Sequence, residues 1–279
     1  MATLKELKGR IKSVRDTSKV TGAMYMISSM KLQSASSSLS GTEPYFRSLE
    51  RELARVSGGV TAQDCAFMRR KEGTAGVFVI ASDKGLCGDY NRRIIREAER
   101  VIDENPGCEL CVIGEKAKNH FASGQFAVRE DFGFKLSKPG EELSYAISGY
   151  FCDLFLKEEI SRLIAVYAAA GGSQTKVLAK TVLPIEPPAE DSPTGKNFEF
   201  LPSKAAVVDS FVPVYLSGVF HSILLHGFIG EHSARMFAMD SANRNAKQLL
   251  DDLNLQYNHL RQNAITTEIA EISGERNRQ

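Results

Sequence analysis

A glycine turn at residues 82–88 (SDKGLCG) contains the first group of residues that could do chemistry, by binding phosphate. The turn follows a predicted strand and precedes a predicted helix, which is where α/β proteins bind phosphate groups. It has neither the G-x-G-x-x-G nor the G-x-x-x-x-G-K-S/T spacing of the phosphate-binding glycine motifs. A tight turn that exposes a contact surface therefore fits these residues better than a nucleotide site.

Two further groups of residues have chemically reactive side chains. Cys108 and Cys111 have the spacing of a redox pair, but they fall in a predicted strand, where residues three apart face opposite sides. No second cysteine pair completes a zinc site. His221, His226 and His232 are separated by five and six residues, so they do not stack on one helix face as metal ligands would.

These patterns predict no metal site and no cofactor site. No catalytic triad, cysteine-histidine pair or carboxylate pair stands out in the sequence. A constellation that the fold assembles from distant residues stays open at this point.

The composition is typical of a globular chain that is made and stays in the cytosol. The 279 residues, 43% hydrophobic and 25% charged, can form one large domain or two modest ones. Five cysteines, an odd number, favour reduced thiols over a disulfide framework. No apolar run approaches the roughly 20 residues that span a bilayer, and the charged opening segment does not match a secretory signal.

The net charge of +1 argues against a dedicated nucleic-acid binder, but the charge is unevenly distributed. Residues 1–31 contain seven Lys or Arg and two Asp or Glu, a local charge of +5. The remainder of the chain is therefore mildly acidic, at −4. The amino-terminal segment is a basic arm.

Apolar residues recur at alternating spacings of three and four along the first 56 residues, which is the pattern of a coiled-coil seam. A helix of about 55 residues would be about 80 Å long, so it needs a partner to cover its apolar face. Pro44 is expected to kink or interrupt this helix. The seam positions are Leu4, Leu7, Ile11, Val14, Ser18, Thr21, Tyr25, Ser28, Leu32, Ala35, Leu39, Thr42, Phe46, Leu49, Leu53 and Val56.

A second seam predicts another long helix, from about residue 206 to Ser273-Gly274, possibly broken at Pro213. Two long helices at opposite ends of one chain indicate an antiparallel coiled coil. Its register is soft, because several seam members are small or polar: Ser18, Thr21, Ser28, Gly218, Ser222 and Asn243. The second seam contains Val208, Phe211, Tyr215, Leu225, Ile229, Met236, Met239, Ala246, Leu250, Leu253, Tyr257, Leu260 and Ala264.

The middle of the chain alternates short strands with helices, which predicts βαβ units and a mainly parallel sheet. Strands are predicted at residues 76–81, 108–113, 163–168 and 176–185, and helices at 91–103, 115–121 and 141–156. The last two strands form a hairpin after Gly171-Gly172, and residues 184–202 form an exposed proline-rich loop. The predicted fold class is α/β: a long antiparallel coiled coil of the terminal helices (residues 1–57 and 206–279) with an inserted Rossmann-like domain (residues 70–205).

Four segments resemble motifs of the gamma subunit of F-type ATP synthases, the central stalk of those complexes. Residues 17–27 (TSKVTGAMYMI) resemble T-x-K-I-T-K-A-M-x-M-V, and residues 82–91 resemble D-R-G-L-C-G-x-x-N. Residues 231–239 (EHSARMFAM) match E-x-x-A-R-M-x-A-M, and residues 255–269 match the closing Y-N-x-x-R-Q-x-x-I-T-x-E-I. The motifs occur in the family's order and spacing on both predicted helices and on the first turn of the inserted domain.

The resemblance implies a non-catalytic rotor shaft without a cofactor. Such a shaft turns inside a ring of alternating alpha and beta subunits, meets the epsilon subunit and the c-ring, and couples proton or sodium ion flow to ATP synthesis or hydrolysis on the beta subunits. It lies at the cytoplasmic face of the bacterial inner membrane and associates with the membrane only through the complex. The resemblance assigns contacts with the alpha/beta ring to Met24, Lys84, Cys87, Arg235, Arg261 and Gln262, and contacts of the foot with the c-ring or epsilon to Phe200 and Leu201.

The sequence departs from the family pattern at three places. Gly22 stands where a base is usual, residues 32–38 (LQSASSS) replace a segment rich in Lys and Arg, and Leu201 replaces an acid. These departures leave a divergent second-copy F-type complex as an alternative. A free-standing coiled-coil adaptor and a nucleotide-binding α/β protein are the alternatives outside the family.

Overall fold

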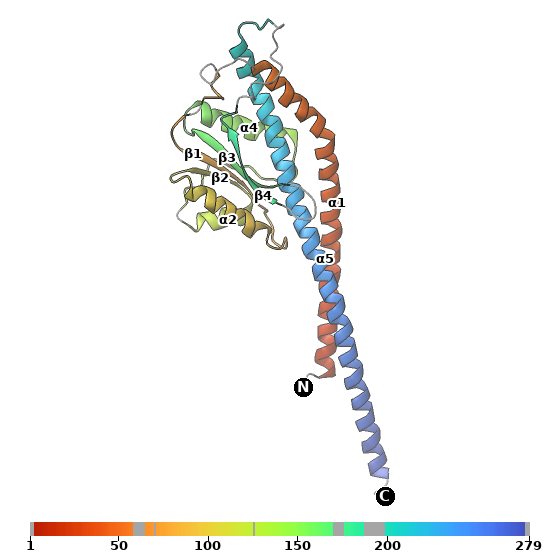
Figure 1. Cartoon of the computed structure of the whole chain (residues 1–279). Helices are drawn as coiled ribbons and strands as arrows, with labels where there is room; N and C mark the ends of the chain where they lie inside the picture. The colour runs from red at the N-terminus through yellow and green to blue at the C-terminus, as the bar shows by residue number, and fades with distance from the viewer. Residues whose placement is uncertain are drawn as a thin grey trace. The chain divides into compact units, whose positions relative to one another are not determined.

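A computed structural model describes residues 3–57, 65–69, 71–124, 126–169, 176–186 and 199–276. The elements, in chain order, are α1 (Leu4–Ser57), β1 (Ala75–Ile80), α2 (Tyr90–Asp103), β2 (Glu109–Ile113), α3 (Glu115–Ala122), α4 (Glu141–Leu156), β3 (Arg162–Ala169), β4 (Lys176–Leu183) and α5 (Lys204–Arg276), as labelled in Figure 1. The chain divides into two compact units. One contains residues 29–234, and the other contains residues 1–28 and 235–279.

The larger unit, called the sheet unit below, is built on four strands in the order β2-β1-β3-β4. β1 pairs in parallel with β2 and with β3, whereas β4 pairs antiparallel to β3. This arrangement confirms the predicted α/β class, the mainly parallel sheet and the hairpin. The glycine turn predicted for that hairpin, at residues 171–172, and most of the loop at 184–202 lie outside the described residues.

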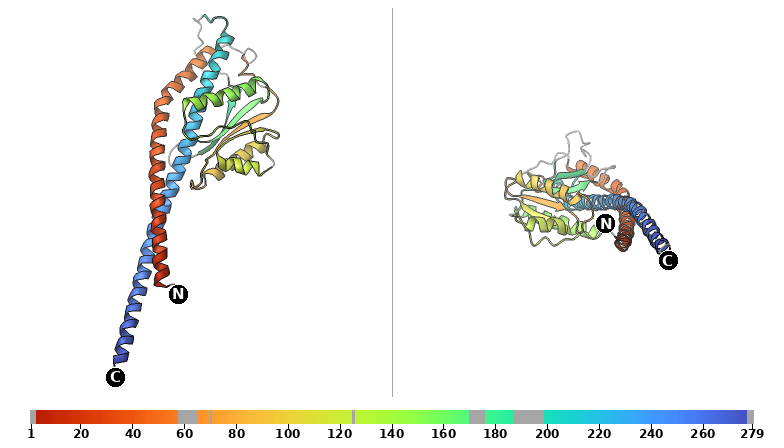
Figure 2. Two further views of the ribbon diagram at one scale, coloured as in Figure 1. Left: turned by 180° about the vertical axis from the view of Figure 1, so that it is seen from behind. Right: turned by 90° about the horizontal axis from the view of Figure 1, so that it is seen from below.

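Each face of the sheet carries its own hydrophobic cluster. Side chains of α2 and α3 pack on one face with Val77 and Val79 of β1. Side chains of α4 and of α5 pack on the other face with Phe78 and Ile80. Figure 2 shows the sheet between α4 and α2. Because successive residues of a strand point to opposite faces, β1 can be fully buried and contribute to both clusters.

Both long helices run unbroken through their prolines, so the break predicted as possible at Pro213 was wrong, and of the two outcomes predicted for Pro44 the interruption was wrong. Helix α1 does bend along its carboxyl-terminal part, which contains Pro44, in agreement with the predicted kink (Figure 1). A proline removes one backbone hydrogen bond, but the turns after Pro44 bury Leu49 and Leu53, and those before and after Pro213 bury Val212 and Leu216. This packing holds the helices together. The predicted stop at Ser273-Gly274 was also wrong, since α5 ends at Arg276; a glycine weakens a helix without forbidding it.

Helix α5 is apolar enough over one stretch to pass a simple test for a membrane span. Within residues 204–267, an 18-residue window has a mean hydropathy of 1.5, and 61% of that window is buried. The apolar side chains of α5 in the sheet unit, among them Val208, Leu224 and Phe228, belong to the core cluster on the sheet. The hydropathy of this stretch is therefore that of a core helix.

The smaller unit, called the helix pair below, consists of the first part of α1 and the last part of α5, which run antiparallel. Leu7 and Ile11 of α1 are buried with Leu253 of α5, and Thr21 is hydrogen-bonded to Asn243. Of the seam positions predicted over both helices, only Tyr25, at 36% exposure, and Ala264 are exposed. The structure thus confirms the predicted antiparallel seam, including its polar members.

Candidate functional site

The glycine turn at residues 82–88, called the contact turn below, is held closed by one buried polar network. Ser82, which is fully buried, donates its backbone N–H to Asn91 Oδ1 at 3.0 Å and its hydroxyl to the carbonyl of Lys84 at 2.8 Å. Asn91 Nδ2 donates in turn to Ser82 Oγ at 2.8 Å and to Cys87 Sγ at 3.3 Å. These groups satisfy one another inside the turn, so they are not presented to a ligand.

The start of α3 supports the contact turn from the side. Gly114 lies so close to the end of β1 that a Cβ atom there would lie 2.3 Å from the carbonyl oxygen of Ala81. Its φ of +103° also requires glycine. This close approach lets the backbone N–H of Glu115 donate to Asp83 Oδ1 at 3.2 Å and that of Lys116 to the carbonyl of Ser82 at 3.2 Å.

The two residues assigned to this turn point in different directions. Lys84 is exposed, whereas the Cys87 side chain is buried, with 2% exposure. Between them Leu86 is 60% exposed and has a φ of +64°, a region that costs a branched side chain about 1–2 kcal/mol. Sequence reasoning missed Leu86. Its only signal was its place between a glycine and a cysteine in the motif.

The other assigned residues lie on two separate parts of the molecule. In the helix pair, Met24 is half-buried, Arg235 is buried with 6% exposure, and Arg261 and Gln262 are exposed. In the sheet unit, Phe200 and Leu201 precede α5. The Lys204 ammonium lies 5.5 Å from the centre of the Phe200 ring, and Leu201 is 86% exposed. Each unit therefore contains four of the eight assigned residues.

Comparison with known proteins decides the family. The family described as ATP synthase matches residues 3–275 of the chain. The ATP synthase gamma chain of Halothermothrix orenii is 33% identical over 281 residues, covering 98% of both chains, and that of Chlorobium phaeobacteroides is 34% identical over 285 residues, covering 98% of this chain and 97% of the relative. The chain belongs to the ATP synthase gamma chain family.

A solved structure supports the same fold. The rotor of the Euglena gracilis mitochondrial ATP synthase has a similar chain with a TM-score of 0.63 and 16% identity, and the match covers 94% of this chain and 98% of that one. As a gamma chain family member, the chain is part of an enzyme complex, the membrane-associated ATP synthase. The predicted family and function are confirmed, and the alternatives gain no support.

The five cysteines of this gamma chain family member are buried, and so are His221 and His232 of α5. Cys108 and Cys111 belong to clusters on opposite faces of the sheet, as the strand pattern predicted, and burial raises the pKa of Cys111 to about 12. His221 Nδ1 lies 3.1 Å from Ser144 Oγ, and the His232 ring lies 4.3 Å from that of Phe228. Within the described ranges, no group of three His, Cys, Asp or Glu side chains could hold a metal ion.

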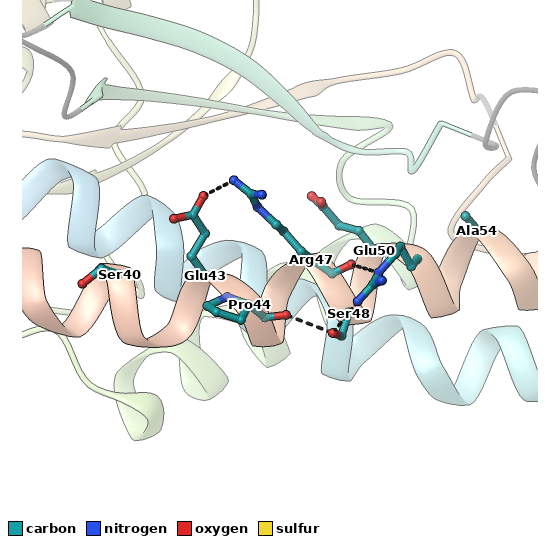
Figure 3. Close-up of a pocket in the computed structure, with 8 residues that line it drawn as sticks. Ser40, Glu43, Pro44, Arg47, Ser48, Glu50 and Ala54 are labelled. Atoms are coloured by element: carbon teal, nitrogen blue, oxygen red, sulfur yellow. Dashed lines mark hydrogen bonds and ion pairs between the residues drawn. The ribbon is translucent and has the colours of Figure 1, made fainter.

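A cavity of about 830 Å³ lies along α1. Figure 3 shows its lining, in which Arg47 Nη2 and Glu43 Oε1 point toward each other at 2.5 Å. A single helix supplies all the lining residues, from Ser40 to Ala54. Small-molecule sites enclose their ligand with groups that converge from several elements, so this shallow surface lacks the geometry of one.

Proposed function

We propose that this chain is the rotor shaft of an F-type ATP synthase and that it couples ion flow through a c-ring to ATP synthesis and hydrolysis on beta subunits. Its partners in this proposal are a ring of alternating alpha and beta subunits, an epsilon subunit and the c-ring. The observation that carries the proposal is the likeness to gamma chains over 98% of the chain, which includes both long helices.

The proposed role is mechanical, and the chain itself is non-catalytic and needs no cofactor. Its assigned residues occur in both units, and four of them, Lys84, Leu201, Arg261 and Gln262, are exposed, which suits protein contacts. The helix pair has a small apolar cluster and polar seam members, so few strong contacts hold its two helices together. Residues 33–38 add an exposed face of Gln and Ser around buried Ala35, so the shaft surface there carries no charge.

The contacts we propose follow the motifs. Arg261 and Gln262 act as a catch against the beta subunits, because a guanidinium can form two parallel hydrogen bonds to a carboxylate. Met24 and Arg235 face the beta subunits where the shaft turns inside the ring. The contact turn, with Lys84 and Cys87, meets the lower part of the ring. Since the Cys87 thiol is buried within the turn, its proposed part is to hold the turn in shape.

Phe200 and Leu201 form the proposed foot toward the c-ring or epsilon, where Leu201 offers an apolar contact in place of an acid. We propose that the complex lies at the cytoplasmic face of a bacterial membrane and that this chain is held there only through its partners. The division into residues 1–57, 70–205 and 206–279 is also part of this proposal.

Co-purification of the full chain with alpha and beta subunits tests the assignment. One shaft for each ring of three alpha and three beta subunits is expected, and a stable homodimer of the chain alone would favour a free adaptor instead.

The catch is tested with Arg261→Ala in vesicles that contain the assembled complex. ATP synthesis should fall about tenfold, the equivalent of one lost charge-assisted hydrogen bond. Arg244→Ala is the matched control, because Arg244 is also exposed on α5 in the helix pair and pairs with Asp240 of its own helix. Normal assembly together with unchanged synthesis by Arg261→Ala would rule out the catch.

A further inference from the structure

One residue of the contact turn has a backbone conformation that the packing of this chain does not explain. Leu86 has a φ of +64° and places its side chain in solvent, with 60% exposure. Glycine adopts this backbone conformation without strain, as Gly88 does two residues later with a φ of +60°. A leucine here gains nothing from the core of this chain and strains the backbone, so another requirement has to account for it.

The surrounding hydrogen bonds keep the strained residue in place. Asn91 holds both ends of the turn, through Ser82 and through the Cys87 thiol. The buried side chain of Cys87 follows Leu86 directly, and the Tyr90 N–H donates to the Cys87 carbonyl at 3.2 Å. Leu86 is therefore a rigidly presented apolar side chain rather than a residue of a loose loop.

We propose that Leu86 is the side chain through which the contact turn binds the ring of alpha and beta subunits, and that Ser82 and Asn91 are its positioning residues. The inference rests on the proposed function and deepens it. In this proposal Leu86, rather than the neighbouring Cys87 thiol, makes the contact with the ring. The buried thiol becomes part of the support.

The chemistry of the turn also describes what it binds. Exposed Lys84 lies two residues before Leu86, and the Lys116 Cε atom lies 3.9 Å from where a Cβ of Gly85 would be. The Asp83 carboxylate, in contrast, accepts the Glu115 N–H. An apolar tip bordered by ammonium groups fits an apolar recess with carboxylates at its rim, on the subunit that the turn meets.

Leu86→Gly is the decisive variant, because it should change stability and function in opposite directions. The full chain should unfold at a temperature about 2–4 °C higher, since glycine removes the backbone strain. ATP synthesis by the assembled complex should fall about tenfold, which is the loss expected for one leucine contact. Leu86→Asn, which also tolerates this φ, should lower synthesis equally. Leu178→Asn, at another exposed leucine of the sheet unit, should leave synthesis unchanged.

A photo-crosslinker tests the contact itself. With p-benzoylphenylalanine in place of Leu86, irradiation of the complex should join the chain to an alpha or beta subunit. The same group in place of Leu178 should not. Absence of the crosslink at position 86, or normal synthesis by Leu86→Gly, would overturn the proposal.

The positioning role of Asn91 has its own readout. Asn91→Ala should lower both the unfolding temperature and ATP synthesis. Combined with Leu86→Gly, it should still lower the unfolding temperature but cause no further loss of synthesis, because both changes act through one contact. A merely structural role would give an additional loss of synthesis in the double variant. Failure of the parent chain to assemble with alpha and beta subunits would instead contradict the proposed function, and the two failures are therefore distinguishable.

Discussion

The sheet unit and the helix pair bury their side chains in different ways. In the sheet unit, Phe78, Phe132, Phe151 and Phe220 form one aromatic cluster, with the Phe151 and Phe220 rings stacked 5.4 Å apart. In the helix pair, the fully apolar cluster has three buried members, Leu7, Ile11 and Leu253. The same chain therefore contains one unit with a dense core and one with a narrow, partly polar seam.

The two kinds of packing should give the two units different mechanical properties. A densely packed core resists deformation, because any displacement loses many van der Waals contacts at once. A seam of Ser18, Thr21 and Asn243 holds its helices with few strong contacts. The effect of these polar seam positions on the stability of the helix pair can therefore be tested directly.

The largest effect should come from truncating the aromatic core. Phe151→Ala should lower the free energy of unfolding by about 3–5 kcal/mol, because it opens a cavity among three other phenylalanine rings. Leu253→Ala in the helix pair should cost about 2–3 kcal/mol, since most of the surrounding side chains, apart from Leu7 and Ile11, are half-exposed and can close over the gap. Denaturant unfolding of both full-length variants measures the comparison, and equal losses would show that the two units are packed alike.

Sequence patterns predicted this contrast only in part. The alternating spacing of three and four identified the seams, and short apolar runs identified the strands, because a strand such as β1 that is buried on both faces is apolar throughout. The prolines did not break the helices, because the local cost of a proline is visible in the sequence, whereas the burial of Leu49 or Leu216 that offsets this cost is not. Exposure within the contact turn was equally hidden, because only the closed network shows that Cys87 points inward and Leu86 outward.

A smaller effect on the free energy of unfolding should come from replacing a polar seam residue of the helix pair. Asn243→Leu should raise the free energy of unfolding by about 1 kcal/mol, because it replaces a hydrogen-bonded amide in the seam with an apolar group of similar shape. The Thr21 hydroxyl keeps an acceptor in the Ser18 carbonyl, at 3.1 Å, so no polar group loses its last partner. Thermal or denaturant unfolding of the full chain shows whether the variant is more or less stable than the parent chain.

Thr21→Val is the matched control for that variant and should have the opposite sign. It removes the hydroxyl but leaves the Asn243 amide in the half-buried seam, at a cost of about 1–2 kcal/mol. If Asn243→Leu also destabilised the chain, the polar pair would be a source of stability. The seam would then be no softer than an apolar one.

The smallest effect is a loss of stability in acid that comes from two histidines of the sheet unit. Burial lowers the pKa of His221 and of His226 below the usual histidine value; Glu141 partly opposes the shift at His221, and at His226 Glu43 opposes it while Lys180 adds to it. The unfolded chain therefore binds protons at a higher pH than the folded chain. Stability is fully present above the ordinary histidine pKa of about 6.5 and falls as the pH drops through it toward the lowered values.

His221→Asn tests the source of this acid sensitivity. Its side-chain amide can bond to Ser144 Oγ in place of Nδ1, but it does not titrate, so the pH slope of the unfolding temperature between about pH 7 and 5 should become shallower. Hydrogen exchange at β1 and β3 should show the same change. An unaltered slope would assign the acid sensitivity to other groups.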